Sequence, residues 1–290
     1  MPEENVAARI AGWFAAGHRD LPWRRAGFSA WGTLVSEFML QQTPVARVIP
    51  ALERWLTRWP TPADLASVPP GEAVRAWERL GYPRRALALH GAATVIAERH
   101  GNVVPADVDA LLELPGVGPY TARAVAAFAY GMRTPVVDTN VRRVLARALR
   151  GQGDASPPRT SADLAEMDAL LPTDPAPARL VNAGTMELGQ TICTARAPRC
   201  DDCPIADLCA WRAAGYPSYE GPRASVQKKY AGSDRQVRGL VLRELRASDT
   251  PVPADAIAGL WADAVQLDRA ISGLLRDGLV VLDAGEYALP

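Results

Sequence analysis

The sequence lacks long apolar runs and carries no excess of either charge. Among its 290 residues, no stretch approaches the roughly 20 apolar residues of a membrane-spanning helix. No apolar core of a signal peptide follows the N-terminus, so we expect a cytoplasmic protein that does not bind a membrane. Lys and Arg total 32 and Asp and Glu total 32, so the formal net charge is zero. A DNA-binding function would therefore have to rest on local sites.

Strand patterns are also scarce. Apolar residues recur at helical spacing through most of the chain, in short segments separated by Pro and Gly. These segments predict helices over residues 5–17, 31–42, 45–59, 61–66, 71–80, 83–100, 106–112, 120–130, 141–150, 161–171 and 176–188. The predicted fold class is all-α.

The last third of the chain changes character. Residues 210–232 are irregular, whereas the residues after them predict helices over 236–247, 254–260 and 264–277. A two-strand hairpin is predicted around Ala284-Gly285 at the end. Three helices and a terminal hairpin are typical of a winged helix. We therefore predict a first domain over 1–212, a linker over 213–232 and a small winged-helix-like domain over 233–290.

Cysteine is rare, and all of it lies in one short segment with the spacing C-x6-C-x2-C-x5-C. In a cytoplasmic chain this pattern indicates a metal-ligand set rather than disulfides. Zinc more often uses paired C-x2-C ends, so the longer flanking gaps here depart from the usual zinc spacing, although zinc remains an alternative. The predicted ligands are Cys193, Cys200, Cys203 and Cys209.

A glycine-rich turn, Leu114-Pro-Gly-Val-Gly-Pro-Tyr120, lies between two apolar helical segments. Gly116 and Gly118 allow positive φ and leave no Cβ in the way, and Pro119 suits the first position of a helix. The N–H groups at such a helix start form an anion site. We predict that Gly116, Val117 and Gly118 hold a phosphate; an ordinary corner between two helices is the alternative.

Two carboxyl groups are candidates for catalysis. Asp138 precedes the helix predicted over 141–150, where an N-terminal carboxylate is stabilised as an anion. A purely structural cap is the alternative. Glu37 lies among apolar residues on its helix, and burial favours the protonated form of a carboxyl group, which could then donate a proton. The alternative is a solvated glutamate.

The order of these motifs resembles a known superfamily. The turn followed by Asp138 is similar to the helix-hairpin-helix–Gly-Pro-Asp DNA glycosylases, which have two helical subdomains. The segment Ser36-Glu-Phe-Met-Leu-Gln-Gln-Thr43 resembles the signature of their MutY-type adenine DNA glycosylases. The resemblance covers roughly residues 5–212 and implies a base excision repair enzyme. It also implies that the four cysteines hold a 4Fe–4S cluster.

The resemblance implies a substrate and a mechanism. The enzyme would flip adenine mispaired with 8-oxoguanine or guanine out of double-stranded DNA and hydrolyse its N-glycosidic bond. Glu37 would protonate the adenine ring and Asp138 would stabilise the sugar cation. Tyr120 replaces the lysine that forms a Schiff base in endonuclease III-like enzymes, so we predict a monofunctional glycosylase with Tyr120 at the sugar–base pocket. We expect a bacterial, nucleoid-associated monomer.

Further site residues follow from the same resemblance. Trp23 and Arg24 are predicted near the adenine pocket, and Tyr82 would insert into the base stack, although Pro83 departs from the family's second aromatic residue. DNA contacts are predicted at Gln41, Gln42, Thr43, Tyr82, Arg84, Arg85, Asn140, Arg143, Arg196 and Arg199.

Two alternative functions remain. One is a thymine glycosylase for T·G mispairs, and the other is a non-catalytic iron–sulfur DNA-binding module. The Nudix-like domain with which MutY-type enzymes read 8-oxoguanine is not recognisable here, so the sequence does not indicate which base opposite the adenine is preferred.

Overall fold

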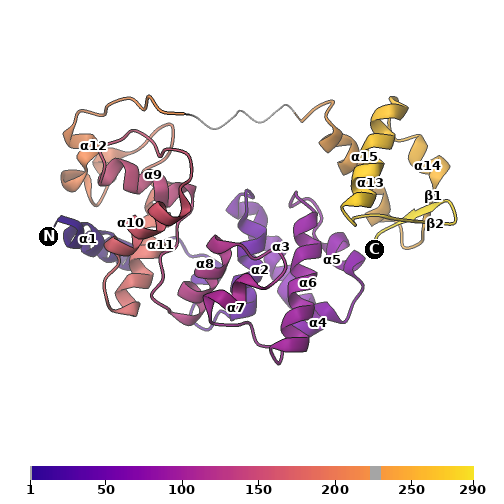
Figure 1. Cartoon of the computed structure of the whole chain (residues 1–290), viewed down its shortest axis with the longest axis horizontal. Coiled ribbons are helices and arrows are strands. Elements are labelled where there is room, and N and C mark those ends of the chain that lie inside the picture. Colours follow the sequence, from indigo (N-terminus) through magenta and orange to yellow (C-terminus); the bar gives the residue numbers. More distant parts are fainter. Residues whose placement is uncertain (1, 223–229) are drawn as a thin grey trace. The chain divides into compact units, whose positions relative to one another are not determined.

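The computed structural model describes residues 2–222 and 230–290 (Figure 1). Helices dominate, as predicted, and none within these ranges is long and apolar enough to cross a lipid bilayer. The described residues form two compact units. Unit 1 comprises 2–33, 106–109 and 118–222, and unit 2 comprises 34–105, 110–117 and 230–290. The domain boundaries predicted from the sequence remain a prediction, and residues 223–229 of the predicted linker lie outside the described residues.

Unit 1 is built on long helices that bury apolar side chains. Ile10, Leu145 and Leu188 are almost completely buried in its core, and α1 packs along α11. The turns of the cysteine segment complete the unit. Its elements are α1 (Pro2–Ala16), η1 (Pro22–Arg24), α8 (Pro119–Tyr130), α9 (Thr139–Ala148), α10 (Thr160–Leu170), α11 (Pro175–Thr191), η2 (Cys200–Asp202), η3 (Ala206–Leu208) and α12 (Ala210–Ala213).

The contact between α1 and α11 gives a prediction about stability. A Cβ added to Gly184 would lie 2.7 Å from Ile10 Cγ2, so we expect Gly184→Ala to lower the free energy of unfolding by about 1–3 kcal/mol. Gly12→Ala is the matched change on α1, where a Cβ would meet nothing within 4 Å and should raise stability by about 1 kcal/mol. Thermal melting of both variants tests this, and equal shifts would contradict it.

Unit 2 begins at Leu34 within α2 (Ala30–Leu40). Three tryptophans pack together in its core. Trp55 is fully buried and packs edge-on against Trp59 and Trp77, with ring centroids 4.7 Å and 5.6 Å away. The helix predicted over 71–80 is shorter than expected, because it ends at Ala76 and Glu78 takes a φ of +46°. The other helices are α3 (Val45–Arg58), α4 (Pro62–Ala66), α5 (Pro70–Ala76), α6 (Arg84–Arg99) and α7 (Val108–Leu112), the last of which spans both units.

The segment 230–290 has the element order of a winged helix. The predicted hairpin is present, with Ala284 and Gly285 at positive φ in its turn. A third strand, β1, was not predicted and pairs with β3, giving the antiparallel order β1-β3-β2. Its elements are α13 (Asp234–Ala247), β1 (Val252–Pro253), α14 (Ala254–Ala258), α15 (Ala264–Arg276), β2 (Val281–Asp283) and β3 (Glu286–Ala288).

Two arginines fasten this segment to α5 within unit 2. Arg75 donates to the carbonyl of Ser248 at 2.9 Å, and Arg246 donates to the carbonyl of Val74 at 3.0 Å. Burial lowers the pKa of Arg246 to about 10. The segment is therefore attached through specific polar contacts with α5.

Candidate functional site

The glycine-rich turn joins α7 to α8. Gly116 has a φ of +74°, and a Cβ there would lie 2.6 Å from Ala88 Cβ and 3.1 Å from Phe38 Cε1. Glycine is thus required at 116 by the backbone and by the packing against α2 and α6. Gly118 differs from the expectation, because its backbone is extended and it is the N-cap of α8. No side chain caps this helix, so its first turn presents a partly positive end.

Tyr120 lies in the first turn of α8 and is half-buried. Its ring packs with Phe128 and Met186 against the small cluster of Ala124, Ala127 and Val136. The hydroxyl lies 3.9 Å from Met186 Sδ. The side chain is therefore held by α8 and α11 of unit 1.

Asp138 caps the N-terminus of α9, as predicted. Its Oδ1 accepts from the Val141 N–H at 2.7 Å, and its Oδ2 accepts from Asn140 Nδ2 at 2.7 Å. Two donors and the N-terminus of α9 therefore hold both carboxylate oxygens in place. The side chain is half-buried, so a fixed anion stands near the surface of unit 1.

Behind Asp138, hydrogen bonds run to the cysteine segment. Arg143 donates to Asn140 Oδ1 at 2.8 Å and to the carbonyl of Cys193 at 2.8 Å, and burial lowers the pKa of its guanidinium. Arg143 is only 6% exposed. The predicted DNA contact at Arg143 is therefore corrected to a structural role, because its donors serve internal acceptors. The Asn140 amide is likewise used inside the protein.

Glu37 is buried on α2, with 6% of its surface exposed. The alternative of a solvated glutamate is thereby excluded. Ser36 and Phe38 beside it are also buried. A carboxyl group in such surroundings can hold a proton for donation.

DNA contacts were predicted at all three residues of the turn that follows α2, but these residues differ in exposure. Gln42 is exposed and has a φ of +57°, and Gln41 is half-buried. Thr43 is only 6% exposed and donates to the carbonyl of Leu80 at 3.0 Å. The predicted DNA contact at Thr43 is therefore corrected, because its hydroxyl ties two turns together.

The DNA-contact residues predicted near Tyr82 also differ in exposure: two are exposed and one points inward. Tyr82 is 48% exposed and takes a φ of +48°. Arg84, at the start of α6, keeps 71% of its side chain exposed beside Asp277, 3.6 Å away. Arg85 points inward, where its guanidinium donates to backbone carbonyls, including that of Phe38 at 2.9 Å. The phosphate contact predicted for Arg85 is therefore corrected.

The predicted adenine-pocket residues lie on η1, and their main partner was missed from the sequence. Glu187 on α11 is 2% exposed and pairs with Arg24 at 2.8 Å and with Arg19 at 2.5 Å. Burial alone would raise the pKa of Glu187, but the hydrogen bonds and charges of the two arginines lower it to about 2. Trp23 is half-buried. A glutamate among apolar residues of a predicted helix was the signal that could have found Glu187.

This buried ion pair gives a pH prediction. Because the pKa of Glu187 is lowered from 4.5 to about 2, its carboxylate stabilises the fold above pH 4.5 and loses this effect as the pH falls towards 2. We expect Glu187→Gln to lower the free energy of unfolding at pH 7 by about 3 kcal/mol, with the difference shrinking below pH 4.5. Asp207→Asn, which breaks an exposed pair with Arg9, is the control. A pH-independent difference in melting temperature would contradict this.

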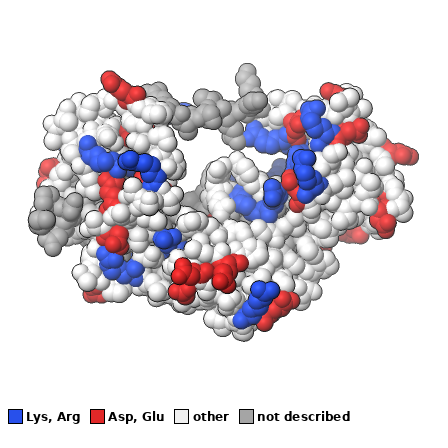
Figure 2. Space-filling view, viewed as in Figure 1, with Lys and Arg blue, Asp and Glu red and all other residues white. Residues whose placement is uncertain are grey.

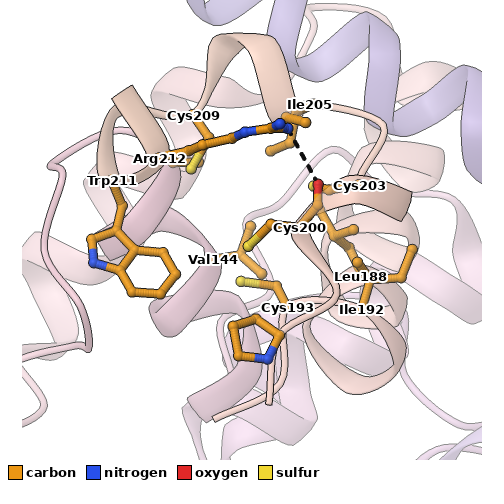
Figure 3. A pocket seen from close by; sticks show the side chains of 13 residues that line it. Val144, Leu188, Ile192, Cys193, Cys200, Cys203, Ile205, Cys209, Trp211 and Arg212 are labelled. Carbon is orange, nitrogen blue, oxygen red and sulfur yellow. Dashed lines mark hydrogen bonds between the residues drawn. The ribbon is translucent and has the colours of Figure 1, made fainter. Parts of the chain in front are cut away.

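The four cysteines come together around one pocket, which Figure 3 shows with their side chains. Its wall also includes the apolar side chains of Val144, Leu188, Ile192 and Ile205 and the side chains of Trp211 and Arg212. In the described part of the chain, no three His, Cys, Asp or Glu side chains converge closely enough for a single metal ion. All four cysteines line this one pocket, and four thiolates are the ligand number of a 4Fe–4S cluster.

Burial in this pocket favours the neutral thiol form of two of the cysteines, so their thiolates need a bound cation. Burial raises the pKa of Cys203 to about 11 and also raises that of Cys193, and metal binding would displace these protons. Arg147, which the sequence did not single out, is 4% exposed, lies 3.4 Å from Cys193 Sγ and stacks on Trp211 at 4.5 Å. Its guanidinium holds Cys193 and also donates to the carbonyls of Thr194 and Ala195, the next two residues.

Exposed basic side chains lie near this pocket, but they do not form a large positive surface. Arg196 is exposed, and Arg199 is exposed and pairs with Asp202 at 3.3 Å. Figure 2 shows basic and acidic side chains in separate small patches, with neither sign covering the face that is drawn. This agrees with the zero net charge and leaves DNA binding to particular sites.

Comparisons with known proteins agree with this site. The profile of the "HhH-GPD superfamily base excision DNA repair protein" family matches residues 35–167, and that of the "iron-sulfur binding domain of endonuclease III" matches residues 193–209. Adenine DNA glycosylases of Mycobacterium tuberculosis and Mycolicibacterium smegmatis are 53% and 54% identical, covering 100% and 97% of this chain and 97% and 94% of theirs. A solved thermostable thymine-DNA glycosylase is 27% identical with a TM-score of 0.66, covering 73% of this chain and 97% of its own.

Proposed function

The chain belongs to the family of adenine DNA glycosylases, within the HhH-GPD superfamily of base excision DNA repair proteins, and on that premise we propose that it acts on adenine mispaired with 8-oxoguanine or guanine in double-stranded DNA. The enzyme acts as a monomer at the bacterial nucleoid. It hydrolyses the N-glycosidic bond and leaves the DNA strand intact.

The observation that carries the proposal is the fixed carboxylate of Asp138. As the bond between the sugar and the adenine breaks, its electron pair moves to the base and the sugar becomes positively charged. The carboxylate of Asp138, held by its two donors at the α9 N-terminus, stabilises that charge. Glu37 donates a proton to a ring nitrogen of the departing adenine. Water then adds to the sugar carbon and loses a proton.

Other residues bind and orient the DNA. The start of α8, which no side chain caps, receives a phosphate of the DNA backbone. The space beside Gly118 is open to it, since a Cβ built at 118 would meet no protein atom within 4 Å. Tyr82 enters the base stack, and Gln41 and Gln42 occupy space beside the unpaired base. Tyr120 packs at the sugar, where its phenol cannot form the Schiff base that leads to strand cleavage.

The adenine pocket and the exposed basic residues complete the proposal. Trp23 contacts the adenine, and Arg24 is held beside it by Glu187. Arg84, Arg196 and Arg199 contribute charge to phosphate contacts. The four cysteines hold a 4Fe–4S cluster, which gives the segment 193–209 its shape when bound.

A panel of duplexes tests the proposed function. The protein is incubated with DNA containing A·8-oxoguanine, A·G or T·G, with and without later alkali, and released bases are identified. We expect adenine release from the first two duplexes and strand breaks only after alkali. Release of thymine would instead support the alternative mispair specificity, and no release would indicate a DNA-binding module. Iron and acid-labile sulfide in the purified protein test the cluster.

A further inference from the structure

The side chain of Arg85 contacts two turns of unit 2. The glutamine turn, residues 41–43, follows α2, and the tyrosine turn, residues 81–83, precedes α6. The first turn has one residue with positive φ, Gln42 at +57°, and the second has two, Gly81 at +83° and Tyr82 at +48°. A non-glycine residue at positive φ keeps this backbone only if its surroundings hold it there.

Arg85 supplies contacts to both turns. Its Nη1 donates to the carbonyls of Phe38 at 2.9 Å and Gln41 at 2.5 Å. Its Nη2 donates to the carbonyl of Gly81 at 3.0 Å and lies 3.5 Å from Thr43 Oγ1. The planar guanidinium can span these acceptors at once, which a single lysine ammonium cannot do.

The same guanidinium also contacts the exposed aromatic ring. Its Cζ lies 5.0 Å from the centroid of the Tyr82 ring, a cation–π arrangement. The hydroxyl of Thr43 adds a direct bond from the glutamine turn to the carbonyl of Leu80 at 3.0 Å. The ring of Tyr82, the carbonyl of Gly81 before it and the carbonyl of Gln41 are thus held by one side chain.

We infer that Arg85 is a positioning residue for base extrusion, which sets Tyr82 and the glutamine turn in one fixed arrangement before DNA binds. The inference rests on the proposed function. Arg85 acts through Tyr82 and Gln41 and touches neither the sugar nor the adenine. Its loss therefore impairs the extrusion of the base, while the side chains of the bond-breaking groups Glu37 and Asp138 are both still present.

The test compares wild type, Arg85→Lys and Arg99→Lys, an exposed arginine at the far end of the same helix. Extrusion is measured as the fluorescence rise of 2-aminopurine placed opposite guanine. Adenine release from A·G is followed under single-turnover conditions, and affinity for a fully paired duplex is measured against salt concentration. We expect Arg85→Lys to lower both the fluorescence rise and the rate about 10- to 100-fold. Paired-duplex affinity, its salt dependence and the Arg99→Lys variant should not change.

Each other outcome has a distinct meaning. A weaker paired-duplex affinity with a salt dependence reduced by about one ion would make Arg85 a phosphate contact and overturn the inference. A smaller active fraction with an unchanged rate per active site would make its role purely structural and also overturn it. If the wild type releases no adenine from any mispair, the proposed function itself has failed.

A double variant separates action through Tyr82 from action elsewhere. If Arg85 works by positioning Tyr82, adding Arg85→Lys to Tyr82→Ala should lower the rate much less than it does in the wild type. Multiplication of the two losses would contradict this part of the inference.

Discussion

Asp138→Asn is expected to lower the single-turnover rate of adenine release by about a thousand-fold or more while DNA binding persists. The amide carries no charge to stabilise the developing sugar cation. The fold of α9 should survive, because asparagine is as good an N-cap as aspartate and can still accept the Val141 N–H that bonds Asp138 Oδ1 at 2.7 Å. Rapid-quench assays with excess enzyme measure the rate, and a binding titration measures the affinity.

The matched control is Asp174→Asn. Asp174 caps α11 in the same unit, accepting from the Ala176 N–H at 3.4 Å, and is exposed. This change removes a charge from a helix N-cap without touching the proposed site, so the rate should equal that of the wild type. Full activity of the Asp138 variant, or the same loss in both, would remove Asp138 from the mechanism.

Glu37→Gln is expected to reduce the rate of adenine release by about 10²- to 10⁴-fold, the usual contribution of general acid catalysis. Glutamine has nearly the same shape, so the buried position on α2 should stay filled and the melting temperature should change little. The amide cannot supply the proton that the departing adenine needs. The rate is measured on the A·G duplex, with circular dichroism to confirm folding.

Glu53→Gln is the control for this change, because Glu53 is an exposed glutamate on α3 of the same unit. It should leave the rate unchanged. A wild-type rate in the Glu37 variant would show that the adenine obtains its proton elsewhere, whereas Asp138 could still stabilise the sugar.

The helical fold could be predicted because each helix has its own local signal. The apolar spacing around Ile10 and Leu145 placed them in the core, and Asp138 was recognisable as a helix N-cap. Strand β1 could not be predicted, because it has two residues, one of them proline. Its strand conformation depends on β3, which lies more than thirty residues later in the chain.

The errors in the site concern arginines and polar residues whose partners are distant in sequence. Arg143 bonds the carbonyl of Cys193, and Arg85 bonds that of Phe38. A sequence pattern shows that an arginine stands near a binding motif, but not whether a backbone carbonyl lies within its reach. A DNA contact was predicted at Thr43 for the same reason, although its hydroxyl bonds the carbonyl of Leu80. Glu37 and the cysteines could be singled out from the sequence more readily, because an acid among apolar residues and a ligand spacing are local patterns.

The contacts of residues 230–290 with α5 bear on experiments that dissect the chain by deletion. A fragment ending at residue 212 would leave the carbonyl of Val74 and the side chain of Arg75 without the partners they have in Arg246 and Ser248. The Gly71 N–H would also lose the Pro290 carbonyl that accepts it at 2.6 Å. A fall in activity of such a fragment would therefore report damage to α5 as much as any function of the deleted segment. Single substitutions on the exposed faces of α13 and α15 would separate the two effects.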